Sequence, residues 1–247
     1  MVHGLRRTGN GPAQVLMRAL WLGKVLYEPV WALQKELRGR VLDGGEETLL
    51  LLEHEPVVTL GHRATAADLL VSVETLAAQG ISVARIERGG QATFHGPGQL
   101  VVYPICRLRG GVVGHVDWLA HAAVSVSVDL GVAATCKKDP VGIWVAQKKL
   151  GAIGVHVEHQ VAIHGLSFNV TRAATQPFRR GLFAACGVKK PEVTSLVEEG
   201  ADSSVTTREV AFRFAKRLLD ARGERNVVVE EAEPSAFFGE MSSAVTR

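Results

Sequence analysis

The residues best suited to chemistry fall in three short segments of the 247-residue chain. In the first, residues 88–99 (RGGQATFHGPGQ), four glycines let the backbone approach a ligand closely and turn several N–H groups toward it. The segment has neither the G-x-G-x-x-G of a dinucleotide site nor the Gly-Lys-Ser/Thr of a P-loop. His95 lies beside Gly96, where its ring could reach such a ligand. A tight structural turn is the alternative interpretation.

In the second segment a lysine pair runs directly into small residues (KKLGAIG, residues 148–154). Glycine and alanine on a strand would leave space for a ligand above them. From spacing alone, a surface lysine pair that opens a strand is the simpler explanation.

The third segment (AACGV, residues 184–188) contains one of the three cysteines of the chain. Their odd number and the absence of C-x-x-C argue against a disulfide framework or a zinc site. Cys186 lies among small residues and is narrowly the best candidate nucleophile. Cys136 competes because two lysines follow it and could lower its pKa. Cys106, at the end of an apolar run, is expected to be structural.

The histidines outside these segments give no convincing metal-ligand set. The pair His54–Glu55 resembles the start of a zinc-protease helix, but Val58 stands where the second histidine would be. Strand alternation places four polar residues on one face, which favours a solvated sheet face over a metal site: His156, Glu158, Gln160 and His164. We therefore expect no metal and no cofactor.

Composition narrows the class of protein. The chain is 47% hydrophobic and 21% charged, which is typical of a globular domain, and it has no apolar run long enough to cross a membrane. A net charge of +3 is too small to indicate nucleic-acid binding; it fits an acidic protein partner or ordinary solubility. The basic, acid-free start could be a transit peptide, but Gly9, Gly11 and Pro12 favour a flexible tail. Free thiols favour a reducing compartment. Between the cytoplasm and an organelle matrix, we expect the cytoplasm.

The elements that must position these segments alternate along the chain. Strands are expected over residues 16–26, 48–60 (a pair), 81–87, 100–105, 142–145, 150–157, 162–170 and 227–231. Helices are expected over residues 29–40, 66–79, 116–131 and 206–221. Residues 88–99 are expected to form a loop, and Pro104 to mark an edge strand or a strand end. This pattern predicts one mixed α/β domain over residues 16–235, with tails at residues 1–15 and 236–247.

Taken together, these blocks resemble the lipoyl(octanoyl) transferase family over roughly residues 16–220. Residues 88–100 match the family loop R-G-G-x-x-T-x-H-G-P-G-Q-L almost throughout. Further blocks agree in order and spacing: LLEHEPVVTLG (51–61), GIWV (142–145), KLGAIG (149–154), HGLSFNV (164–170), and CG (186–187) followed by VTSL (193–196). The chain departs from the family at Ala185, where proline is usual, and in residues 171–175, which lack an acidic residue.

The resemblance implies the α/β (α+β) fold shared with biotin and lipoate protein ligases, a single domain with a mixed, largely antiparallel sheet and flanking helices. It implies transfer of an octanoyl group from octanoyl-acyl carrier protein to a lysine of lipoyl domains, those of 2-oxoacid dehydrogenases and of the glycine cleavage H protein. It makes Cys186 the nucleophile, through a thioester, and Lys149 rather than Lys148 the catalytic lysine. The substrate-binding residues it implies are Arg88, Gly89, Gly90, Gln91, Ala92, Thr93, Phe94, His95, Ala152, Ile153, Gly154, His164, Gly165, Leu166 and Ser167.

An apolar tunnel would be needed for the acyl tail, and Phe94, Ile153, Val155 and Leu166 are candidates for its wall; core packing is the alternative for each. Two other functions share the expected fold or partner. An ATP-dependent lipoate or biotin ligase would need no cysteine nucleophile, and a non-catalytic binder of carrier protein would show no turnover.

Overall fold

The computed structural model describes residues 17–183, 192–224 and 227–233. Its main feature is an eight-stranded sheet with the order β11-β1-β2-β6-β10-β9-β8-β7. The strands are β1 (Arg18–Val25), β2 (Thr48–His54), β6 (Gln99–Arg107), β7 (Thr135–Lys138), β8 (Val141–Val145), β9 (Lys148–Glu158), β10 (Val161–Asn169) and β11 (Val229–Glu231). Strand β1 pairs in parallel with both its neighbours, and every other pair in this sheet is antiparallel. The expected mixed, largely antiparallel sheet is thus confirmed.

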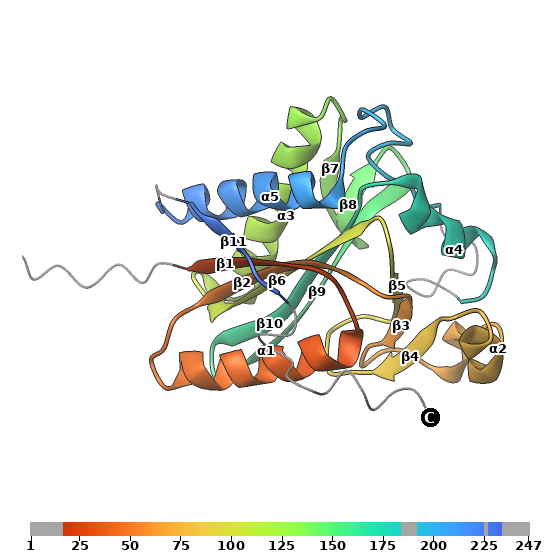
Figure 1. Cartoon of the computed structure of the whole chain (residues 1–247), viewed down its shortest axis with the longest axis horizontal. Helices are drawn as coiled ribbons and strands as arrows, with labels where there is room; N and C mark the ends of the chain where they lie inside the picture. Colours follow the sequence, from red (N-terminus) through yellow and green to blue (C-terminus); the bar gives the residue numbers. More distant parts are fainter. Residues whose placement is uncertain (1–16, 184–191, 225–226, 234–247) are drawn as a thin grey trace, which may run out of the picture.

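Helices cover both faces of this sheet (Figure 1). Helix α1 (Tyr27–Leu42) lies on one face, and α3 (Gly111–Asp129) and α5 (Thr207–Ala221) lie on the other. The run of leucines in β2 follows from this arrangement: Leu49 and Leu51 join the core under α3 and α5, while Leu50 and Leu52 join the core under α1. A strand buried on both faces is apolar at every position rather than at alternate ones.

A second, three-stranded sheet packs beside the first, at the lower right of Figure 1. Its order is β4 (Ser82–Arg85), β3 (Val57–Leu60) and β5 (Ala92–His95). The short helices nearby are η1 (Ala66–Asp68), α2 (Val73–Ala77), η2 (Arg172–Thr175) and α4 (Gln176–Arg179). Strand β5 leads within four residues into β6, so this passage joins the small sheet to the large one.

The prediction of a single helix over residues 66–79 is wrong, because tertiary contacts divide this segment into η1 and α2. The carboxylate of Asp68 accepts a hydrogen bond from the Thr65 backbone (2.8 Å) and closes η1. Leu69 then forms a β-bridge with Phe183, and the helix restarts only at Ser72, whose hydroxyl accepts from Thr75 N (3.2 Å). The restarted helix ends at Ala77 with Ala78 as its C-cap, earlier than the expected end at Gly80; Gly80 has a left-handed φ of +70° in the turn that follows.

Two further expectations are corrected in the centre of the sheets. The segment 88–99 is not wholly a loop, since it contains β5. Pro104 lies neither on an edge strand nor at a strand end, because β6 is central between β2 and β10. The β6–β10 ladder is interrupted between the pairs Ala162↔Cys106 and Leu166↔Val102, so the missing N–H of the proline removes no bond there. The edge strand β7 was not expected, because its residues TCKK show no apolar alternation.

Candidate functional site

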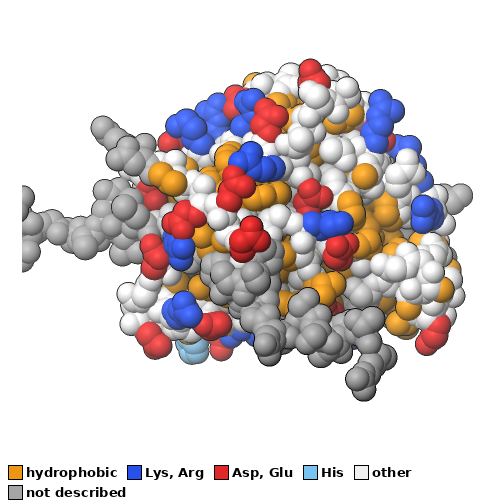
Figure 2. All heavy atoms as spheres, in the orientation of Figure 1, with side chains coloured by type: hydrophobic (Ala, Val, Ile, Leu, Met, Phe, Trp, Pro, Cys, Tyr) orange, Lys and Arg blue, Asp and Glu red, His pale blue; other side chains and the backbone are white. Residues whose placement is uncertain are grey.

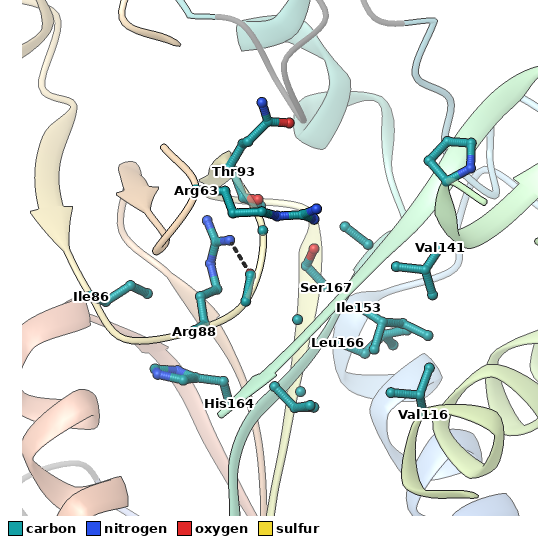
Figure 3. A pocket seen from close by; sticks show the side chains of 18 of the residues that line it. Arg63, Ile86, Arg88, Thr93, Val116, Val141, Ile153, His164, Leu166 and Ser167 are labelled. Carbon is teal, nitrogen blue, oxygen red and sulfur yellow. Dashed lines mark hydrogen bonds between the residues drawn. The ribbon is translucent and has the colours of Figure 1, made fainter. Parts of the chain in front are cut away.

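A cavity of about 510 Å³ lies between the two sheets. Strands β9 and β10 form one wall, and the segment 88–95 and Tyr27 at the start of α1 form the other (Figure 3). Of the expected site residues within the described part of the chain, Lys149 and all the expected substrate-binding residues except Ala92 and Phe94 line it. The structure therefore brings together three segments that are far apart in the sequence.

Ala92 and Phe94 do not line the cavity, because β5 alternates. Thr93 and His95 face the cavity, whereas Phe94 packs in the core of the small sheet, 5.7 Å from the ring of Phe183. A Cβ on Gly96 would lie 2.5 Å from the Phe94 ring, so the glycine that follows the histidine makes room for this packing. The candidate tunnel wall thus keeps Ile153, Val155 and Leu166 and loses Phe94.

Arg88 places a permanent positive charge in the cavity wall. Its Nη2 donates to the carbonyl and hydroxyl oxygens of Thr59 (2.8 Å each), and its Nη1 donates to the carbonyl of Gly89 (2.9 Å). Gly89 N in turn donates to Val155 O (3.2 Å), which ties the glycine-rich segment to β9. A Cβ on Gly61 would lie 2.9 Å from Nη1, so this position in the motif LLEHEPVVTLG requires glycine.

His95 is buried and neutral at physiological pH. Burial, together with the nearby His54 and the Arg88 charge, holds the pKa of His95 well below its ordinary value. Its Nδ1 lies 2.8 Å from Gln99 Oε1, and its Nε2 lies 3.4 Å from the Thr59 hydroxyl. The ring also stacks on Tyr27, with the centroids 6.4 Å apart.

A chain of amide hydrogen bonds fixes which nitrogen of His95 carries the proton. The backbone carbonyl of Thr194 can only accept, so Asn169 presents Nδ2 to it (2.9 Å) and turns Oδ1 toward Gln99 Nε2 (2.9 Å). Gln99 therefore faces His95 with Oε1, and Nδ1 of His95 is the protonated nitrogen. The lone pair of Nε2 is left toward Thr59, so the histidine is held as a hydrogen-bond acceptor on that side.

Lys149 is the second residue of β9, is half-buried and lines the cavity. Its backbone is bonded in both directions to the segment 192–194: Lys149 N donates to Glu192 O (2.8 Å), and Thr194 N donates to Lys149 O (3.0 Å). Gly142, with φ +153°, makes room for the side chain, since a Cβ there would lie 2.8 Å from Lys149 Cε.

The neighbouring Lys148 lies in a different environment. It is exposed, does not line the cavity, and forms an ion pair with Glu199 (3.0 Å). Since successive strand residues point to opposite sides, only one lysine of the pair can face the cavity. That residue is Lys149, the one matched by the family pattern.

Cys186, the expected nucleophile, lies outside the described residues. Of the two described cysteines, Cys106 is buried in the core, and burial raises the pKa of its thiol to about 11. A thiol of this kind stays protonated and unreactive. Cys136 is exposed on β7 and does not line the cavity.

The histidines that could have suggested a metal have other roles. His54 is buried, and its Nδ1 donates to Val25 O (3.1 Å) while its Nε2 accepts from the Tyr103 hydroxyl (3.1 Å); burial lowers its pKa to about 4. Burial likewise lowers the pKa of His164 to about 3. Across the described ranges, no group of three or more His, Cys, Asp or Glu side chains is arranged to hold a metal ion, and no helix is long and apolar enough to cross a membrane.

Comparison with known proteins decides the family. The model of the lipoyl protein ligase A/B catalytic domain matches residues 27–219, which is most of the chain. The chain belongs to this family. Relatives named octanoyltransferase show that it is an enzyme, an acyltransferase. The matched range includes every described residue that we place at the cavity.

Family relatives carry the name octanoyltransferase. One from Acidobacterium capsulatum is 36% identical over 82% of this chain and 88% of its own length, and one from Koribacter versatilis is 37% identical over 83% and 86%. Among solved structures, lipoate-protein ligase A bound with ATP superposes with a TM-score of 0.68 over 88% of each chain at 16% identity. A biotin protein ligase from Leishmania major superposes with a TM-score of 0.50 over 84% of this chain and 75% of its own, also at 16% identity. The expected fold relationship is confirmed.

Several residues at the site were not expected from the sequence. Tyr27, Arg63 and Tyr103 line the cavity, and Gln99 and Asn169 form the amide chain behind it. Gln99 and Asn169 lie in matched motifs, so their motif membership was the available signal. Tyr27 and Tyr103 gave no signal in the sequence, because the residues around each fit core packing equally well.

Proposed function

We propose that this enzyme moves an octanoyl group from the thioester of an acyl carrier protein to a lysine of a lipoyl domain, through a thioester on Cys186. One observation carries the proposal: the backbone of Lys149, at the cavity, is bonded on both sides to residues 192–194, which follow Cys186 by a few positions. Relatives named octanoyltransferase support the acyl group. A bi-partite lipoate protein ligase from Thermoplasma acidophilum, described with its E2 lipoyl domain, shares the fold (TM-score 0.64, 17% identity, 88% and 86% covered).

In the first step, the thiolate of Cys186 attacks the carbonyl carbon of the carrier thioester. A new S–C bond forms, the bond to the pantetheine sulfur breaks, and the leaving thiolate takes up a proton. The ammonium of Lys149 favours the attacking thiolate electrostatically. Backbone N–H groups of the glycine-rich segments stabilise the oxyanion.

In the second step, the neutral amine of the acceptor lysine attacks the acyl-enzyme. The amide C–N bond forms, the Cys186 thiolate leaves, and the amine loses a proton, which Lys149 helps to carry away. The acyl group stays activated as a thioester throughout, so the reaction needs no ATP. His95, neutral and held by Gln99, lines the substrate site and is not assigned the role of base.

Intact-protein mass spectrometry tests the proposal. Mixing the enzyme with octanoyl-carrier protein should add one octanoyl group, removable by hydroxylamine and mapped to Cys186. Cys186→Ala should abolish the adduct, and Cys136→Ala is the matched control that should keep it. A label on Cys136 would overturn the site assignment, and activity that requires ATP and magnesium would indicate a ligase instead.

A further inference from the structure

The cavity has two unlike ends. In Figure 3, His164 and Ile86 lie at one end and Val141 and Val116 at the other, with Ile153 and Leu166 nearer the latter. Gly142, next to Val141, adjoins the side chain of Lys149, so the reacting end is the one near Val141.

The end near His164 contains buried polar atoms without partners. Among the residues that the structure describes, Nε2 of His164 and the hydroxyl of Tyr27 have no hydrogen-bond partner, although each residue is only 1% exposed. The nearest carboxylate oxygen, on Glu87, is 3.9 Å from His164 Nε2, beyond hydrogen-bonding distance. Both residues line the cavity, and hydrocarbon packed against this end would offer their polar atoms no hydrogen bond.

The register of the β9–β10 hairpin gives the distance between the two ends of the cavity. A Cβ on Gly142 would lie 3.4 Å from Lys149 Nζ and 2.7 Å from Gly151 O, which sets the ammonium near the level of Gly151. His164 pairs with Val155, four residues further along β9, or about 13 Å at 3.3 Å per residue. An extended eight-carbon thioester spans only about 10 Å, at roughly 1.2 Å per bond as in an extended backbone.

We propose that His164 and Tyr27 set the upper limit of the acyl chains that this enzyme accepts. The inference rests on the proposed acyl transfer and deepens it. An eight-carbon chain attached near Lys149 ends short of the polar atoms and lies along Ile153 and Leu166. A chain longer by about three or more carbons (at roughly 1.2 Å per bond) reaches His164 and Tyr27, where hydrocarbon would have to pack against buried polar groups that it cannot satisfy.

Two variants of different kinds test this limit. Tyr27→Phe removes the hydroxyl while keeping the ring that stacks on His95. His164→Gly removes the imidazole at a position with φ +60°, a backbone conformation that glycine adopts readily. The matched control is His115→Leu, which removes another buried histidine whose Nε2 has no partner among the described residues but which does not line the cavity. Thermal melting checks that each variant is folded.

The measurement is the rate of acyl-enzyme formation with carrier protein bearing chains of six to fourteen carbons. In the wild type the twelve-carbon rate should fall about tenfold below the eight-carbon rate, the size expected when a chain must pack against a buried polar group that it cannot satisfy. Tyr27→Phe or His164→Gly should raise the ratio of the twelve-carbon rate to the eight-carbon rate about tenfold. His115→Leu should leave this ratio unchanged.

The failures of the two proposals are distinguishable. If the wild type takes up eight carbons but its length profile is flat, or if the profile is the same in both folded cavity variants, the length limit is wrong and acyl transfer stands. If the wild type takes up no chain of any length, the proposed function is wrong and the inference falls with it.

Discussion

The side-chain amide of Asn169 holds the backbone carbonyl of Thr194 at 2.9 Å. Thr194 is also bonded through its N–H to the carbonyl of Lys149, so a buried amide at the end of β10 secures the segment that pairs with the lysine. On its other side, the same amide accepts from Gln99 and thereby sets the tautomer of His95. One asparagine therefore links the segment paired with Lys149 to the amide chain that holds His95.

Asn169→Ala should destabilise the enzyme by about 1–3 kcal/mol, because it leaves the Gln99 amide and the Thr194 carbonyl buried without their partner. Urea denaturation measures the free energy of unfolding. Gln79→Ala, an exposed amide on the small sheet side, is the control and should change that free energy by less than about 0.5 kcal/mol. An equal effect of the two substitutions would contradict the role given to Asn169.

Gly142→Ala should impair catalysis by pushing on Lys149. The added Cβ would lie 2.8 Å from Lys149 Cε and 2.7 Å from Gly151 O, at a φ that favours glycine. We expect a loss of stability of about 1–3 kcal/mol from overpacking and a roughly tenfold or larger drop in acyl-enzyme formation. Gly39→Ala, inside α1 with no atom within 4 Å of its Cβ, should instead stabilise the enzyme by about 0.5–1 kcal/mol.

The stability of the enzyme should decrease as the pH falls from about 6.5 to about 4. Burial lowers the pKa of His115 from 6.5 to about 4, as it does for His54, so the unfolded chain binds more protons than the folded one in this window. The free energy of unfolding therefore rises with pH there, by up to about 1.4 kcal/mol per pH unit for each such histidine.

His115→Leu should make this slope shallower, and denaturant unfolding at several pH values measures it. The matched control is His121→Leu on the same helix α3, where the side chain is exposed to solvent. An unchanged slope in His115→Leu would show that the buried imidazole does not drive the acid sensitivity.

Lys149→Ala should slow acylation at neutral pH and let it recover partly in alkaline buffer. In the proposed mechanism the charge of Lys149 favours the thiolate, so its removal should let the thiol of Cys186 return toward a pKa of about 8.5. Lys149→Arg keeps the charge but cannot exchange a proton, so it should restore some acylation and still impair transfer to the acceptor. Lys148→Ala is the control, because that side chain lies outside the cavity. The measurement is the single-turnover rate of acylation and of transfer for each variant as a function of pH. If Lys149→Ala acylates with the wild-type rate and pH profile, Lys149 does not activate Cys186.

Association with an acidic carrier protein should weaken as salt is raised. Lys138 is exposed and lines the cavity, so Lys138→Gln should raise the KM for carrier protein and reduce its salt dependence. Lys216→Gln on α5, already paired with Asp220, is the control. Figure 2 shows basic and acidic side chains interspersed on one face of the molecule. Two ion pairs, Arg18–Glu230 and Arg208–Glu231, join β1 and α5 to β11. A KM for carrier protein that is independent of salt would contradict docking by charge.

The sequence was most informative where local patterns coincide with tertiary demands. The amphipathic helix ending at Ala221 and the hairpin of β9 and β10 follow from periodicity alone. Pro104 misled because its tolerance in a central strand depends on a gap in the neighbouring ladder, which only the pairing reveals. Within the glycine-rich segment, motif membership could not separate Thr93, which faces the cavity, from Phe94, which faces the core. Strand alternation decides that, once β5 is known to be a strand.

The cavity is walled by two sheets whose hydrophobic cores are separate, and only one wall carries Lys149. Substitutions in the aromatic cluster under β5, such as at Phe94, Phe178 or Phe183, would change the packing behind the wall opposite Lys149 and so the width of the cavity. None of these three residues lines the cavity. Evolution therefore has a route to new acyl preferences through residues that do not line the site, and surveys confined to contact residues would overlook it.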